Sequence, residues 1–254
     1  MRLAGLLIPP IGLLFFIALI QLDALKSLKT STELKPRAEE IYQQIELDTL
    51  KLQLLKSIPT FGFSNIFANL TLLEFIQYFG SDNERTLDGY SLSPKFFEVI
   101  VEYDPRFTES YLYLTNTVSI YAGQPQKSID LMSQGLSFML PNAPSRSFFV
   151  WRYKGTDEML FTSDSDAAQK SFQTSADWAE QSSHDEAKLI AELSQRTANF
   201  LATNPNSKPA LIHGWMAVLS WAIDDNVRSK AISQIEALGG EVLMAENGQV
   251  TIRY

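Results

Sequence analysis

Cysteine is absent from the 254 residues of this chain, and histidine occurs only twice. Without thiols the chain forms no disulfide, no thiolate zinc site and no iron–sulfur cluster, and it has no cysteine nucleophile. His184 stands in a Ser-Ser-His-Asp-Glu segment typical of a helix start, and His213 lies on an amphipathic helix. Neither has enough ligand-type neighbours in the sequence to complete a metal site. We therefore predict two structural histidines, no metal and no cofactor.

Positive charge is scarce as well. The 21 Lys and Arg residues are outnumbered by 29 Asp and Glu residues, which gives a formal net charge of −8. A protein that binds nucleic acid neutralises phosphates with basic side chains, so this balance excludes nucleic acid from the predicted partners.

Catalytic motifs are missing too. The sequence has no Gly-rich phosphate-binding loop, and no nucleophile stands beside a recognisable base. The neighbouring carboxylates Asp157 and Glu158 are the basis of an enzymatic alternative, which no motif supports. We predict that the protein is not an enzyme.

The N-terminal region contains an uncharged, apolar run at residues 3–22. Twenty such residues are about what a helix needs to cross ~30 Å of hydrocarbon, so the run predicts a transmembrane helix within an anchor of residues 1–25. Pro9 and Pro10 are compatible with it, because the first turn of a helix needs no backbone donors. The alternative is a cleaved secretory signal, although a small-residue cleavage site is missing.

Flanking charge predicts the orientation of this segment. Arg2 alone precedes it, whereas four basic residues follow it: Lys26, Lys29, Lys35 and Arg37. Basic residues concentrate on the cytoplasmic side of membrane helices, so we expect a single-pass membrane protein with its soluble domain in the cytoplasm. If the segment is cleaved, the domain is instead an exported periplasmic binding module.

The next part of the chain changes from polar to strongly apolar. Residues 26–60 predict a juxtamembrane linker followed by an amphipathic helix. The run 63–79 is apolar on almost every side, which predicts a helix covered by neighbours. Phe61, Phe63 and Phe67 are expected in the core, with a membrane surface as the alternative.

An interval of forty residues recurs in the middle of the chain. It separates five pairs of corresponding positions: Tyr111 and Trp151, Gly123 and Ser163, Ser128 and Ala168, Met132 and Phe172, and Gly135 and Ser175. Each unit has a helix with a large aromatic residue, a turn, and a second helix with small residues at set offsets. One amphipathic pair cannot cover its own apolar face, so this period predicts stacked helix pairs.

The repeating positions resemble the tetratricopeptide repeat (TPR) over about residues 63–180, within a repeat domain of residues 61–180. The matching residues are Glu102-Tyr103-Asp104-Pro105 at the end of a unit, Tyr111 and Leu114 on one first helix, and Trp151 and Gly155 on the next. The chain departs from the family pattern in two ways. Each first helix is one residue too long, and the turn of the earliest unit is enlarged between Ser81 and Leu92.

The resemblance implies an all-α, TPR-like solenoid of antiparallel helix pairs that binds a protein or peptide client in its groove. Together with the anchor, the layout is similar to that of bacterial membrane-anchored TPR proteins, cyanobacterial ones among them, several of which assist the assembly of membrane complexes. We therefore expect a non-enzymatic scaffold or assembly factor. The implied groove positions are one, two and five residues beyond each aromatic: Leu112, Tyr113, Asn116, Arg152, Tyr153 and Thr156. Asn116 and Arg152 are suited to hold a peptide backbone or carboxylate.

Residues 181–254 are predicted to form further helices and a small hairpin. The expected helices are 185–202, 209–223 and 225–238. Two β-prone runs, 242–244 and 250–252, flank Asn247-Gly248, a pair favoured in tight hairpin turns. A β-hairpin that covers the last helix is therefore expected.

Overall fold

The computed structural model describes residues 38–81, 90–205, 207–222, 225–244 and 250–253. The chain divides into two compact units, residues 1–44 and residues 45–254. Only residues 38–44 of the first unit are described, so the fold that follows is essentially that of the second.

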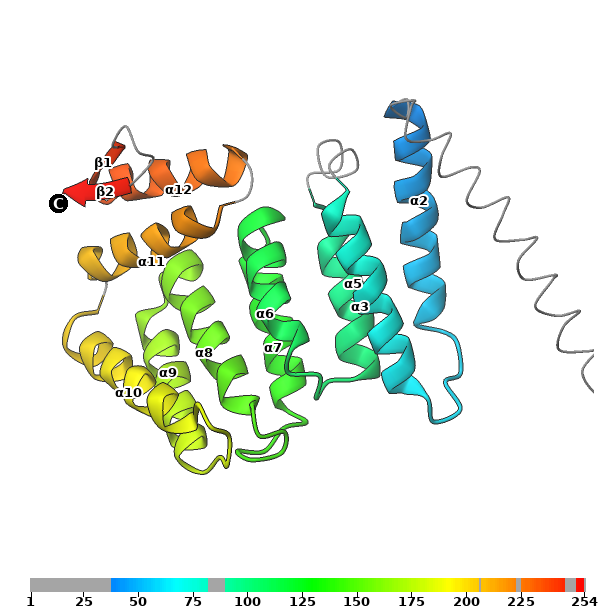
Figure 1. Cartoon of the computed structure of the whole chain (residues 1–254), viewed down its shortest axis with the longest axis horizontal. Helices are drawn as coiled ribbons and strands as arrows, with labels where there is room; N and C mark the ends of the chain where they lie inside the picture. The colour runs from blue at the N-terminus through cyan, green and yellow to red at the C-terminus, as the bar shows by residue number, and fades with distance from the viewer. Residues whose placement is uncertain (1–37, 82–89, 206, 223–224, 245–249, 254) are drawn as a thin grey trace, which may run out of the picture. The chain divides into compact units, whose positions relative to one another are not determined.

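Helices dominate the described residues, which confirms the predicted all-α class (Figure 1). The α-helices are α2 (Ala38–Leu55), α3 (Ser64–Gly80), α5 (Ser93–Tyr103), α6 (Ser110–Leu114), α7 (Pro125–Leu136), α8 (Ser147–Asp157), α9 (Ser165–Glu180), α10 (Ala187–Thr203), α11 (Lys208–Trp221) and α12 (Asp225–Ala237). Two π-helical segments continue α6 and α8: η1 (Thr115–Tyr121) and η2 (Glu158–Thr162). Two short strands follow α12: β1 (Glu241–Met244) and β2 (Val250–Arg253).

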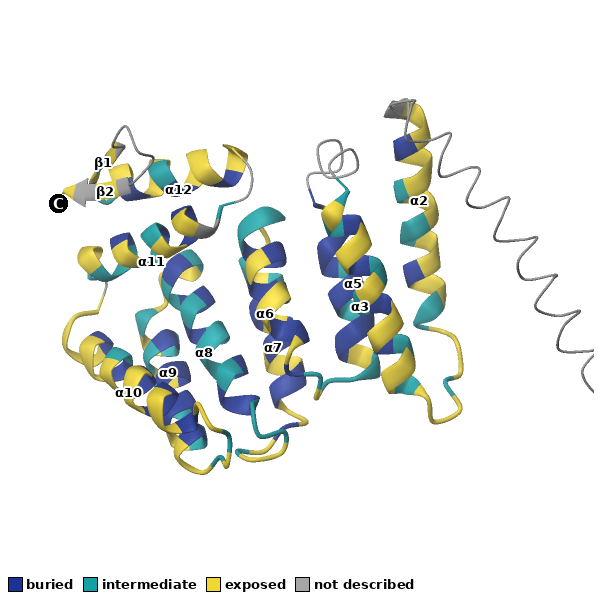
Figure 2. Ribbon diagram, in the orientation of Figure 1, coloured by how far each residue is buried: buried dark blue, intermediate teal, exposed yellow. Residues whose placement is uncertain are grey.

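Helices that are close in sequence pack side by side in the larger unit. α3 packs on α5, α7 on α8, α8 on α9, α9 on α10, and α11 on α12 (Figure 1). The largest apolar cluster draws residues from α3 through α8, among them Phe75, Phe97, Tyr111 and Met132, all 0% exposed. Figure 2 shows this pattern along the chain, with buried and exposed residues alternating around each helix. The core therefore runs from helix to helix, because each helix buries its apolar face against its neighbours.

Small residues stand where the helices approach most closely. A Cβ atom on Gly135 would overlap the Tyr111 side chain, and one on Gly155 would lie 3.1 Å from the Phe172 ring. The Tyr111 hydroxyl, packed over Gly135, donates a hydrogen bond of 2.8 Å to the Pro105 carbonyl. The small and aromatic positions that repeat in the sequence are thus contact positions between helices.

The aromatic residues before and within α3 correct an expectation. Phe61 is 86% exposed and Phe63 is 59% exposed, so their predicted burial is wrong. Phe67 is half-buried, with its ring 5.6 Å from that of Tyr103. The reason is that α3 buries only the face that includes Phe75, and the opposite face of the helix remains exposed. Its exposed apolar residues are Ile66, Leu70, Leu73 and Ile76.

The predicted single-pass membrane localisation is also corrected. Among the described residues, no helix combines the length and the apolar character needed to cross a bilayer. The prediction depended on the apolar run of residues 3–22, which lies outside the described residues. Even α3, with its apolar sequence, is a 17-residue helix with one face packed in the protein core.

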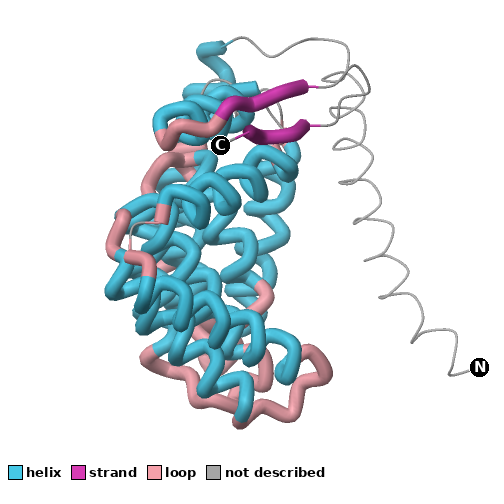
Figure 3. The backbone as a smooth tube through the Cα atoms, turned by 90° about the vertical axis from the view of Figure 1, so that its left-hand side faces the viewer, coloured by secondary structure: helices cyan, strands magenta, loops and turns pink. Residues whose placement is uncertain are grey.

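The C-terminal region agrees with its sequence pattern. α10, α11 and α12 occupy the three predicted helical stretches to within two residues at either end. β1 and β2 pair antiparallel, with Val242 opposite Ile252 and Leu243 opposite Thr251, which confirms the hairpin (Figure 3). Val242 packs against the apolar cluster of α11 and α12, so the hairpin covers that end of the core. The Asn247-Gly248 turn lies outside the described residues.

Candidate functional site

The segments η1 and η2, which continue α6 and α8, are π-helical. In η1, the Ala122 amide donates to the Thr117 carbonyl over 2.8 Å, a bond that spans five residues instead of four. Shifting η2 back by the forty-residue interval places it over 118–122, which overlaps η1. A π-turn inserts one residue without ending the helix, and such turns occur often at functional sites. The two segments therefore lie about one forty-residue interval apart in the sequence.

A cavity of about 380 Å³ lies beside both π-helical segments. Its walls come from α3, the α6–η1 and α8–η2 helices, α11 and α12, with Ala222 between the last two. The lining residues are Phe79, Tyr113, Thr115, Asn116, Thr117, Ile120, Tyr121, Thr156, Asp157, Leu160, Phe161, Gly214, Ala217, Val218, Ala222 and Val227. This volume falls in the range of about 300–1,000 Å³ typical of ligand-binding pockets.

The cavity has apolar walls and one polar side. Phe79, Ile120, Phe161 and Val218 are representative of the apolar walls. The polar side is formed by residues of η1 and the end of α8: Thr115, Asn116, Thr117, Thr156 and Asp157. A predominantly apolar pocket with a few convergent polar groups is the usual composition of a binding site.

Asp157 is fully buried, and its carboxyl group joins three helices. Ser119 of η1 and Ser128 of α7 both donate hydrogen bonds to Oδ2, the second over 2.8 Å. Oδ1 has no hydrogen-bond partner among the described residues. Burial, with a smaller effect of the Glu158 charge, raises the pKa of Asp157 to about 7, although the hydroxyls of Ser119, Ser128 and Thr115 oppose that shift by stabilising the ionised form. The carboxyl group is therefore desolvated and only half satisfied.

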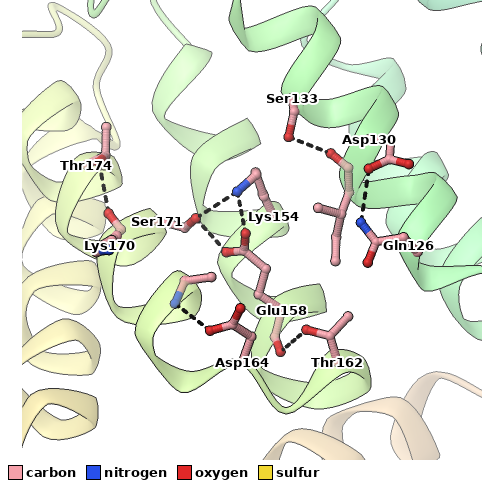
Figure 4. Close-up of polar contacts among 12 residues, drawn as sticks. Gln126, Asp130, Ser133, Lys154, Glu158, Thr162, Asp164, Lys170, Ser171 and Thr174 are labelled. Carbon is pink, nitrogen blue, oxygen red and sulfur yellow. Dashed lines mark hydrogen bonds and ion pairs between the residues drawn. The ribbon is translucent and has the colours of Figure 1, made fainter.

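Glu158, the next residue, is buried in a different environment. Its carboxylate forms an ion pair with Lys154 and accepts a hydrogen bond of 2.6 Å from the Ser171 hydroxyl (Figure 4). Lys154 also donates to Ser171 over 3.3 Å and lies 5.5 Å from the centre of the Trp151 ring. Glu158 thus has an internal counter-charge and belongs to the packing between α8 and α9 rather than to the cavity.

Three of the six predicted groove residues meet at the cavity. Tyr113, Asn116 and Thr156 all line it, although they come from the α6–η1 and α8–η2 helices. Tyr113 and Asn116 are exposed, and Thr156 is half-buried. Asn116 therefore occupies a position in which its amide can contact a bound segment.

The other three predicted residues lie elsewhere. Leu112 is 46% exposed and does not line the cavity. The Arg152 guanidinium donates to Ser194 over 3.1 Å and lies 5.7 Å from the centre of the Phe172 ring. Burial lowers the pKa of Arg152 from its ordinary value. The Tyr153 ring stacks on that of Phe149 at 6.1 Å. Arg152 therefore contacts residues of α9 and α10, and the Tyr153 ring contacts a residue of its own helix.

Sequence reasoning missed Asp157 as a cavity residue. Asp157 stands seven residues after the buried Val150, so helical spacing puts the two on one face of α8. A carboxylate on a buried face is the signal that could have found it. The sequence has no comparable signal for Phe79, Val218 and Val227, because these cavity residues come from distant parts of the chain.

The histidines occupy unrelated places. His184 Nδ1 accepts the Glu186 amide over 3.2 Å, and its ring lies 6.1 Å from that of Phe148, as expected at a helix start. His213 is an exposed residue of α11. Within the described ranges, no three side chains of Asp, Glu or His gather in a metal-binding arrangement.

Comparison of the chain with protein-family models, curated proteins and solved structures gives no match. The geometry of the cavity is therefore the basis for the functional argument.

Proposed function

We propose that the helices of residues 61–180 stack as TPR-like pairs and that the protein is a non-enzymatic interaction module, which binds a segment of a client protein at the cavity. The observation that carries the proposal is the meeting of Tyr113, Asn116 and Thr156 at one cavity. These residues stand at the positions that line the groove in the repeat that the sequence resembles.

The packing of the helices supports the first part. Neighbouring helices bury apolar faces against each other, and Gly135 lets α7 approach the buried Tyr111 ring. Close approach at a small residue, repeated at a fixed period, is how stacked helix pairs are built.

The chemistry of the cavity supports the second part. Its apolar walls can take bulky side chains of a bound segment, whereas the exposed amide of Asn116 can hydrogen-bond the backbone of that segment. This combination of apolar anchoring and backbone bonding is typical of peptide recognition by helical grooves.

Position-specific crosslinking tests the proposal. A photo-reactive amino acid is placed at Asn116, which lines the cavity, or at Gln134, an exposed residue of α7 away from it. We expect Asn116 to capture a defined segment of one protein, identified by mass spectrometry, and Gln134 not to capture it.

The captured segment then provides the second measurement. As a synthetic peptide it should bind the purified full-length chain, and Ala217→Trp, which fills the cavity, should weaken binding at least tenfold. Ala202→Trp on the exposed face of α10 is the matched control. Equal capture from both positions, or equal affinity for both Trp variants, would contradict the proposal.

A further inference from the structure

The charge of the described cavity lining is negative. Among the described residues that line it, Asp157 alone is a carboxylate, and none is lysine, arginine or histidine. The nearest cations in sequence have other partners: Arg152 contacts Ser194 and Phe172, and Lys154 pairs with Glu158. An anionic group in the cavity would therefore meet repulsion, whereas a cationic group would meet its counter-charge.

The hydrogen bonding of Asp157 points the same way. Both serine hydroxyls donate to Oδ2, and Oδ1 is left without a donor among the described residues. Buried acceptors without a donor are rare in proteins, and each calls for a specific explanation. Oδ1 has almost no solvent-accessible surface, so a cationic group in the cavity would act on this carboxyl group through its charge.

The Asp157 carboxylate is already desolvated before a cation binds. Asp157 is 0% exposed in the free protein, so its desolvation is already part of the folded state and is not repeated when a ligand binds. A lysine side chain combines an apolar stem with a terminal ammonium, which suits apolar walls that end at a carboxylate.

We propose that the cavity binds a lysine side chain of the client together with its apolar neighbours, with the ammonium group held in the cavity by the negative charge of Asp157. This inference rests on the proposed function, because it assigns the chemistry of the client segment. The lysine stem packs between walls such as Ile120 and Val218, and a flanking apolar side chain fills the remaining volume.

Three small probes of the same shape and different charge test the inference on the full-length protein. They are 4-phenylbutylamine (a cation), 4-phenylbutan-1-ol (neutral) and 4-phenylbutyrate (an anion), titrated at pH 8 by calorimetry or NMR. We expect the amine to bind at least tenfold more tightly than the alcohol, and the carboxylate to bind most weakly. Equal affinities, no binding of the amine, or a preference for the carboxylate would overturn the inference.

Two variants identify the group responsible. Asp157→Asn should remove the preference, so that the amine and the alcohol bind this variant with equal affinity. Asp130→Asn removes the same charge from the exposed face of α7 and should leave the tenfold preference intact. A preference that survives in Asp157→Asn would overturn the assignment. If Asp157→Asn fails to fold, two other results still test the inference. The unmodified protein should bind the amine most tightly and the carboxylate most weakly, and Ala217→Trp should lose this order of affinities.

The outcome is separable from that of the crosslinking experiment. Specific capture at Asn116 with no amine preference would retain client binding and reject the lysine. An amine preference without position-specific capture would retain the cavity chemistry and reject a protein client.

Discussion

Asp157 and Glu158 are adjacent in sequence, and both are almost completely buried, yet their surroundings differ in one respect. Glu158 has a counter-charge from Lys154 of α8, one turn earlier in the chain, and accepts a hydrogen bond from Ser171 of α9. Asp157 faces η1, α7 and the cavity, where two serines donate to one oxygen and no cation is present among the described contacts.

The difference shows how burial alone fails to define a role. A buried carboxylate with its own cation is complete, and its removal affects chiefly the packing around it. A buried carboxylate that lacks a cation retains an unused acceptor and a raised pKa, features that are enriched at functional sites. Substitutions on each side of this pair should therefore give different responses.

The largest effect is expected from Lys154→Met, which leaves the Glu158 carboxylate buried without its cation. Lys154 and Glu158 side chains are 15% and 6% exposed, so solvent cannot replace the lost partner. Breaking a buried pair of this kind costs ~3–5 kcal/mol in the free energy of unfolding. Urea denaturation followed by circular dichroism measures it.

The double variant Lys154→Met with Glu158→Gln is the control for that substitution. Because it removes both charges, it should recover most of the lost stability. A double variant as unstable as Lys154→Met alone would show that the ion pair is not the cause.

Asp157→Asn should change how stability depends on pH. The folded pKa of Asp157 is about 7, above the ordinary 3.8, so the folded state holds this proton in a range where the unfolded chain has released it. The free energy of unfolding of the unmodified protein should therefore fall as pH rises from about 4 to about 7, by at most ~1.4 kcal/mol per pH unit from this group. Asp157→Asn should lack this contribution.

Thermal unfolding from pH 4.5 to pH 8, compared between the two proteins, measures the difference. Asp130→Asn controls for the change in net charge. Parallel pH profiles for Asp157→Asn and the unmodified protein would contradict the assignment of a raised pKa to Asp157.

Ser128→Ala removes one of the two hydroxyl donors to Asp157. A hydrogen bond to an ionised group contributes ~1.5–3 kcal/mol, against ~0.5–1.5 kcal/mol for a neutral one. The destabilisation should therefore be larger at pH 8 than at pH 5, where the carboxyl group is protonated. Chemical denaturation at the two pH values measures this difference, and Ser133→Ala, an exposed position on the same helix, is the control.

The smallest effect is expected from Glu98→Gln. Glu98 bridges Lys56 and Lys127, the latter at 2.5 Å, but its side chain is 27% exposed and both lysines are more exposed still. Burial raises the pKa of Glu98, and the hydrogen bonds from the two lysines outweigh that effect, so the net pKa is lowered. Its contribution is present at neutral pH and is lost as pH falls below its ordinary value of 4.5.

We expect Glu98→Gln to lower the free energy of unfolding by less than ~1 kcal/mol at neutral pH, as measured by urea denaturation. A loss comparable to that of Lys154→Met would show that exposure does not separate the two ion-paired carboxylates.

Three of the groove positions that the repeat resemblance implies, Tyr113, Asn116 and Thr156, line the cavity. Their part in binding a client stays a prediction. The resemblance implies Arg152 and Tyr153 in the same way, but their side chains contact Ser194 and Phe149 and do not line the cavity. Periodicity predicts the direction of a side chain and not the partner that it meets.

The N-terminal helices show the same limit. The run 63–79 is so apolar that the sequence predicts burial on all sides, yet Leu70 and Leu73 are more than half exposed. Apolar composition indicates a preference for burial, whereas the number of neighbours that are present decides whether a second face is covered.

By itself, the sequence determined the helical class, the forty-residue interval and the terminal hairpin, because these follow from local spacing and turn chemistry. Only the tertiary structure decided that η1 and η2 are π-helical and that five separate regions line a cavity. It also decided that Asp157, and not Glu158, faces that cavity. The physical reason is that the electrostatic environment of a carboxylate depends on groups brought together by folding, such as Ser119 and Ser128, which no local pattern places beside it.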